Sequence, residues 1–158
     1  MNNRNLLKII IAVVLVSLLV VYFSYSFNRD NSVTIISSEL NSQEEKINRI
    51  KHYIEFESDV LGVEYIFNLH SGSMFALGPS DMSLEIALRV LPSDVPKWTK
   101  SHSEITAPAS AKDWKTRLRL TDDIWKTQSD PHYYSIDANT WMAVFTPEGI
   151  IYRETFTR

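Results

Sequence analysis

The clearest pattern in the sequence is the alternation of apolar and polar residues over positions 82–90. Apolar side chains occupy every second position, and the positions between them are mostly polar. Because successive side chains of a strand point to opposite faces of a sheet, this period of two predicts an amphipathic strand. We expect Leu84, Ile86 and Leu88 to face the core. Residues 78–81, Gly-Pro-Ser-Asp, are typical of a turn before this strand rather than of a catalytic loop.

Four further segments predict strands. Residues 63–70 alternate in the same way, whereas 132–137, 139–145 and 150–156 are rich in aromatic and β-branched side chains. Between the last two, Thr-Pro-Glu-Gly at 146–149 has Pro and Gly at the second and fourth positions of a β-turn. The segment ending at residue 145 is apolar on both of its faces, which predicts a central strand that is covered on both sides.

Residues 43–57 predict the longest helix. Ser42 and Glu45 have the spacing of a capping box, and isoleucine recurs behind them at i, i+3 and i+7. Two shorter helices are predicted to begin near Ser93 and Thr121. Together these elements predict an α+β fold: a mostly antiparallel sheet of about five strands, one longer helix and two short helices.

The N-terminal apolar run has a different character. Residues 9–27 carry no charge, and as a helix they would be about 28 Å long, close to the roughly 30 Å of a bilayer core. Arg4 and Lys8 precede the run and no acid does, so the positive-inside rule places the N-terminus in the cytoplasm. We therefore predict a single-pass transmembrane signal-anchor in the bacterial plasma (inner) membrane. The alternative is a signal peptide that is cleaved after Ser26.

This prediction divides the chain into four parts. They are a cytoplasmic N-terminus (1–8), the transmembrane helix in contact with lipid (9–27), a polar tether (28–42) and an α+β domain outside the cytoplasm (43–158).

Composition excludes several kinds of chemistry. The chain has no cysteine, which rules out disulfides, zinc–thiolate sites and thiol catalysis. Its formal net charge is −3, and because Arg4 and Lys8 precede the apolar run, residues 29–158 carry −5. That balance argues against nucleic acid as a partner.

No catalytic residue, metal site or cofactor is predicted. The four histidines, at positions 52, 70, 102 and 132, form no pair with the spacing of metal ligands. Serine, histidine and acid side chains occur near Asp81, but no Gly-x-Ser-x-Gly motif supports a nucleophile. Four glycines are too few for a phosphate-binding loop.

One basic stretch suggests a binding surface. Residues 112–119, Lys-Asp-Trp-Lys-Thr-Arg-Leu-Arg, could form an exposed strand or sheet edge, because Arg117 and Arg119 alternate. With Trp114 and Lys115 they make the best candidates for contact with a partner, since Trp and Arg often dominate interfaces. The alternative is a solvated edge whose charges prevent aggregation.

These observations favour a protein- or envelope-binding module that does no chemistry, and an immunity-type inhibitor of a toxin is one version of it. The alternative is a small envelope hydrolase or sugar-binding enzyme. An enzyme would need a concave pocket that brings at least two of the histidines and acids within hydrogen-bond reach. A binding module would instead show a flat or edge-strand patch around Trp114.

Overall fold

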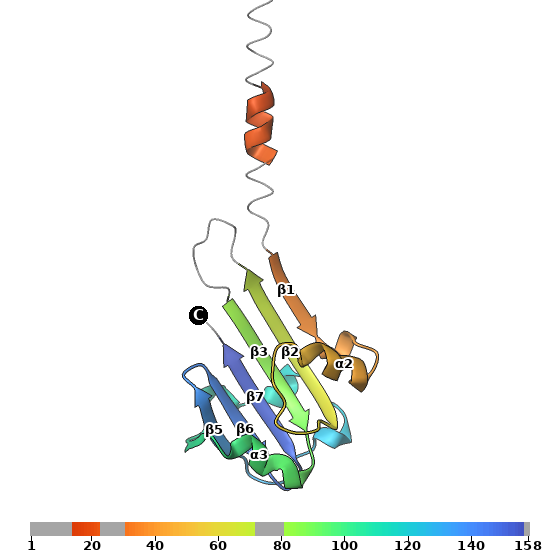
Figure 1. Cartoon of the computed structure of the whole chain (residues 1–158), viewed down its shortest axis with the longest axis vertical. Coiled ribbons are helices and arrows are strands. Elements are labelled where there is room, and N and C mark those ends of the chain that lie inside the picture. Colours follow the sequence, from red (N-terminus) through yellow and green to blue (C-terminus); the bar gives the residue numbers. More distant parts are fainter. Residues whose placement is uncertain (1–13, 23–30, 72–80, 157–158) are drawn as a thin grey trace, which may run out of the picture.

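The computed structural model describes residues 14–22, 31–71 and 81–156 (Figure 1). Its centre is one seven-stranded sheet in the order β1-β2-β3-β7-β6-β5-β4, and every neighbouring pair is antiparallel. The strands are β1 (Asn31–Ile36), β2 (Gly62–Ser71), β3 (Asp81–Arg89), β4 (Ser103–Ile105), β5 (His132–Asp137), β6 (Thr140–Phe145) and β7 (Ile150–Phe156).

Helices are few and short. Besides the helical residues 14–22, those of the described part are α2 (Gln43–Ile50), α3 (Val95–Thr99) and α4 (Trp114–Arg117), with 3-10 turns η1 (Ser37–Glu39), η2 (Pro92–Asp94), η3 (Ala109–Ala111) and η4 (Asp123–Trp125). The predicted α+β fold with about five strands is therefore wrong. Two strands were missed, and the helices are too short to form a layer of their own.

The sheet buries both of its faces. On one, which we call the Ile86 face, Leu84, Ile86 and Leu88 are at most 1% exposed and pack with Ile50 and Trp98 from the α2 and α3 segments. These three side chains, at every second position of β3, confirm the prediction that they face the core.

The opposite face, which we call the Tyr152 face, is covered by the chain between β4 and β5. Trp114, Leu118 and Trp125 pack there on Ala143 of β6 and Tyr152 of β7. All six residues of β6 are buried, which confirms the central strand covered on both sides. The turn before β7 is also confirmed, since the Gly149 N–H donates to the Thr146 carbonyl at 3.2 Å.

The predicted helix at 43–57 begins where expected but ends early. The Ser42 side chain accepts a hydrogen bond from the Glu45 N–H, as the capping spacing predicts. The regular helix ends at Ile50, and Ile54 reaches the same core from the irregular segment that follows.

Three other predictions of local structure were wrong. Strand β1 lies inside the predicted tether at 28–42, and it pairs with β2 from Asn31↔Ser71 to Ile36↔Ile66. The second short helix is only the 3-10 turn η4. The basic stretch at 112–119 is not a strand, because it contains α4, with Asp113 and Arg119 in the left-handed backbone region at either end.

The predicted membrane span is also contradicted. Within residues 14–22, 31–71 and 81–156, no helix has the length and apolar character needed to cross a bilayer. Residues 14–22, the described part of the apolar run, are helical. The predicted transmembrane signal-anchor and plasma-membrane location therefore lack support. Residues 9–13 and 23–27 of that prediction, and residues 78–80 of the predicted turn, lie outside the described residues.

Candidate functional site

Trp114, the first of the predicted binding residues, lies in the core. It is only 6% exposed and stacks on the Tyr152 ring with centroids 5.0 Å apart. The Phe145 ring is also close, with its centroid 5.9 Å from that of Trp114. The apolar cover of the Tyr152 face therefore depends on this side chain.

Arg117 is tied into a network beneath α4. Its Nε donates to Glu85 Oε2 at 2.7 Å, and its Nη2 donates to the Tyr152 hydroxyl at 2.6 Å. Its Nη1 donates to the backbone carbonyls of Ser110 and Lys112 at 3.1 and 2.6 Å. The guanidinium thus clamps the 110–117 segment onto β3 and β7.

Two carboxylates share this network. The Tyr152 hydroxyl donates to Glu85 at 2.8 Å and lies 3.3 Å from Glu154. Burial, followed by the charges of Glu85 and Glu154, raises the pKa of Tyr152 strongly, so it remains a neutral donor. Burial also raises the pKa of Glu154. These groups satisfy one another and stabilise the packing of α4.

Lys115 and Arg119, the other two predicted binding residues, lie in different surroundings. Lys115 Nζ donates to Thr127 Oγ1 at 2.7 Å and lies 5.5 Å from the Trp114 ring centroid. Burial lowers the pKa of Lys115. Arg119 is exposed and lines a small hollow beside the ion pair of Lys46 and Glu64. The four residues therefore do not form one exposed patch, and a binding role for them stays a prediction.

Histidines and acids of the described part do not come within hydrogen-bond reach of one another in a pocket. Their one contact within hydrogen-bond distance joins His132 Nδ1 to Glu104 Oε1 at 2.8 Å, and both side chains are 61% exposed. The same part of the chain holds no group of three or more residues that could ligate a metal ion. The requirement that we set for a hydrolase is thus not met by the residues that the structure describes.

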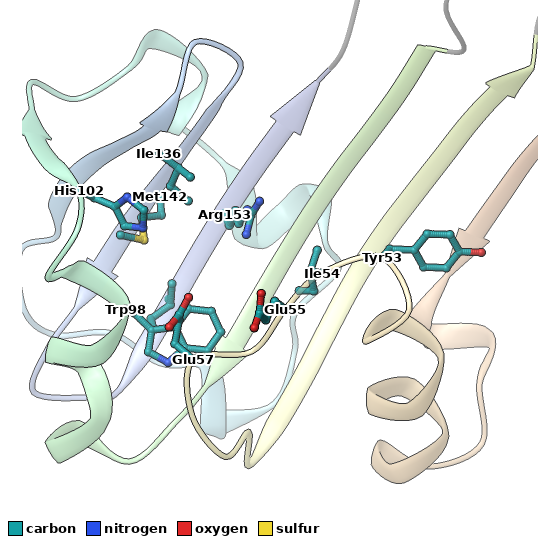
Figure 2. A pocket seen from close by; sticks show the side chains of 10 residues that line it. Tyr53, Ile54, Glu55, Glu57, Trp98, His102, Ile136, Met142 and Arg153 are labelled. Carbon is teal, nitrogen blue, oxygen red and sulfur yellow. The ribbon is translucent and has the colours of Figure 1, made fainter.

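A charged pocket opens instead on the Ile86 face, between the segment that follows α2 and the α3–β4 connection (Figure 2). We call it the Arg153 pocket. Its volume is about 240 Å³. Its lining includes Glu55, Glu57, Trp98, His102, Met142 and Arg153.

Arg153 forms the floor of this pocket. It lies on the central strand β7, paired with Ile86 on one side and Met142 on the other, and these two neighbours are at most 1% exposed. Its one hydrogen bond among described residues is a long one, from Nε to Thr155 Oγ1 at 3.4 Å. No described carboxylate lies within 4 Å of its guanidinium.

The rim of the pocket carries charge of the opposite sign. Glu55 and Glu57 are exposed on the segment after α2, and Figure 2 shows their carboxylates on the side of the pocket near Trp98. His102 is half-buried on the other wall, beside Met142. The pocket therefore places a cationic floor next to an anionic rim.

A second surface feature is the outer edge of β1. The sheet order ends at this strand, so no described strand pairs with its outer side. Its sequence, Asn-Ser-Val-Thr-Ile-Ile, has no charge and no proline. Val33 is 48% exposed there, and Tyr53, which packs on Phe67 beside it, is 47% exposed.

The sequence patterns identified neither feature. Strand β1 was interpreted as part of a polar tether, although its run of β-branched residues was the available signal. The alternation of the last strand put Arg153 on the same face as Ile151, and an arginine on an apolar face was the signal for the pocket.

No protein-family model, curated protein or solved structure matches this chain. Function is therefore inferred from the geometry of its own residues.

Proposed function

We propose that the chain is a protein-binding module that accepts an extended segment of a partner protein along β1, as an eighth strand of the sheet. The observation that carries this proposal is the open outer edge of β1, which is six residues long and lacks charge and proline. An open edge presents unpaired N–H and C=O groups, and these form main-chain hydrogen bonds with an added strand.

The two edges of the sheet differ in a way that supports this choice. Strand β4 has only three residues, and its Glu104 carries a charge in the middle. Shortness and charge are the usual protections of an edge strand, and β1 has neither. An edge left unprotected in this way favours recognition of a partner.

Side chains beside β1 indicate the chemistry of the partner. On the Ile86 face, the exposed Val33 and Tyr53 lie next to the half-buried Ile35. A partner strand would place alternate side chains against this strip. We therefore expect an uncharged segment with apolar residues at every second position.

Site-specific photo-crosslinking tests the proposal. A photoreactive residue replaces Val33 in the full-length chain in its native host cells, and the matched control carries it at Ile105 on the other edge. Position 33 should give an adduct with a second protein, and peptide mapping should place that adduct in an uncharged segment. A synthetic peptide of that segment should then bind the purified chain.

A variant with a charged side chain on the edge strand β1 gives the most direct test. Val33→Lys should abolish peptide binding with an unchanged circular dichroism spectrum, whereas Ile105→Lys should leave binding intact. Equal crosslinking at both positions, or adducts only between two copies of the chain, would overturn the proposal.

A further inference from the structure

The position of a charged residue, Arg153, on an apolar face of the sheet needs a physical reason. Arg153 lies between Ile86 and Met142, with Ile151 as the preceding residue on the same face. Burial lowers the pKa of Arg153, and the charge of Asp137 raises it in part. Placing a cation there is unfavourable unless an anion or hydrogen-bond acceptors compensate it.

The described residues supply little of that compensation. The long bond to Thr155 Oγ1 uses only Nε. The two terminal nitrogens, which form the fork that binds a carboxylate, have no described acceptor within hydrogen-bond distance. Arg117 of α4, which packs on the opposite face of the sheet, makes the opposite case, because its three guanidinium nitrogens are all engaged.

The space above Arg153 limits the size of a ligand. A cavity of about 240 Å³ is smaller than the roughly 300–1,000 Å³ of pockets for drug-sized molecules. Ile54, Ile136, Met142 and Ile151 line it with apolar surface. A molecule that fits this space is therefore small and has an aliphatic part.

The charges on the rim set a second requirement for a molecule that binds in the pocket. Glu55 and Glu57 place two carboxylates across the pocket from Arg153, and no described ion pair joins them to it (Figure 2). A simple anion would be attracted by the floor and repelled by the rim. A molecule with a carboxylate at one end and an ammonium group at the other satisfies both.

We propose that the Arg153 pocket binds a small zwitterion of the amino-acid type, with its carboxylate on Arg153 and its ammonium group toward Glu55 and Glu57. The aliphatic side chain lies against Met142 and Trp98. Tyr53 borders both this pocket and the strip beside β1, but the site does not depend on the partner proposed there.

Isothermal titration of the full-length chain tests the site, with L-leucine as the probe. Two analogues each lack one charge: 4-methylpentanoate has no ammonium group, and 3-methylbutylamine has no carboxylate. L-Leucine should bind at least about tenfold more tightly than either analogue, since a hydrogen bond to a charged group is worth more than that factor. Equal binding of 4-methylpentanoate would show a simple anion site and overturn the proposal.

Variants locate the binding. Arg153→Lys keeps the charge but loses the fork and should weaken L-leucine binding by at least about tenfold. Glu55→Gln with Glu57→Gln changes only the exposed rim, so it keeps the test informative if the floor variant does not fold. Glu39→Gln on η1 is the matched control and should bind as the unaltered chain does. Absence of L-leucine binding at millimolar concentrations, or unchanged binding in the rim variant, would overturn the proposal.

Discussion

Gly149 is the residue whose replacement should be least tolerated. Its φ is +64°, and a Cβ there would lie 2.2 Å from the Val90 carbonyl oxygen. The carbonyl of the same glycine accepts a hydrogen bond from the Val90 N–H at 2.8 Å, so the backbone segments at residues 90 and 149 cannot separate freely. Strain from the backbone angle alone costs about 1–3 kcal/mol, and the overlap adds to it.

We therefore predict that Gly149→Ala lowers the free energy of unfolding by more than about 2 kcal/mol. Gly62→Ala is the matched control, because a Cβ there meets only ordinary contacts at 3.9 Å. It should be neutral or slightly stabilising, by up to about 1 kcal/mol. Chemical denaturation of both variants compares them directly, and equal losses would show that the turn does not require glycine.

The ionisation of Glu148 should make the stability of the fold depend on pH. Hydrogen bonds from the Ser129 hydroxyl and the Gln128 N–H lower the pKa of Glu148 from 4.5 to about 2. A carboxylate with a depressed folded-state pKa stabilises the fold above its unfolded pKa, and that contribution is lost as pH falls through the folded value. Glu148 should therefore contribute above about pH 4.5 and lose its contribution between pH 4.5 and 2.

Glu148→Gln should remove that part of the pH dependence. Melting temperatures measured from pH 6 to pH 2 should fall less steeply for this variant, and it should already be less stable at pH 6. Glu39→Gln, on the exposed turn η1, should keep the slope of the unaltered chain. A Glu148→Gln curve parallel to that of the unaltered chain would contradict the assignment.

In the segment from η3 to η4, the sequence predicted a partner contact at Trp114, whereas the structure buries this side chain in the core. Trp114 packs on Phe145 and Tyr152, and removing a buried Trp typically costs about 3–5 kcal/mol. Trp114→Ala should therefore destabilise the fold by that amount, whereas Lys112→Ala on the same segment, with an exposed side chain, should stay within about 0.5 kcal/mol. Equal thermal melts of the two variants would show that α4 does not cover the sheet.

Strand prediction from sequence was reliable where one pattern held over many residues. Strands β2, β3, β5, β6 and β7 were predicted, because alternation or a high content of aromatic and β-branched residues indicated each of them. Strands β1 and β4 were missed because edge strands bury little. A short segment without a buried face has no hydrophobic period, so its pairing depends on the neighbour rather than on its own residues.

The basic stretch was misinterpreted for a different reason. Arg117 and Arg119 alternate as they would in a strand, yet Asp113 and Arg119 both adopt left-handed backbone angles, which enclose a helix of only four residues. Such angles favour glycine, and neither position is glycine, so no local signal marked the ends of the helix. Arg153 lies on the same face of β7 as Ile151, but a pocket above it depends on where the segments after α2 and α3 lie.

At the scale of the whole molecule, the protection of amide hydrogens against exchange with solvent should fall from the centre of the sheet toward both edges. Strands β3, β7 and β6 have neighbours on each side and lie under both layers of apolar cover, whereas β1 and β4 have one neighbour each. Amide groups that open only with the whole fold exchange slowest, and those at exposed edges open locally at little cost.

We therefore predict that amide hydrogens of β6 and β7 exchange with solvent at least about a hundredfold more slowly than those of β1 and β4. Hydrogen exchange followed by mass spectrometry measures all four strands in one experiment on the full-length chain. Exchange in β1 as slow as in β6 would mean that its outer edge is already covered, and the open edge on which the proposed partner binding depends would not exist. Selective slowing of β1 on addition of the crosslinked partner's peptide, with β4 unchanged, would instead place the added strand on that edge.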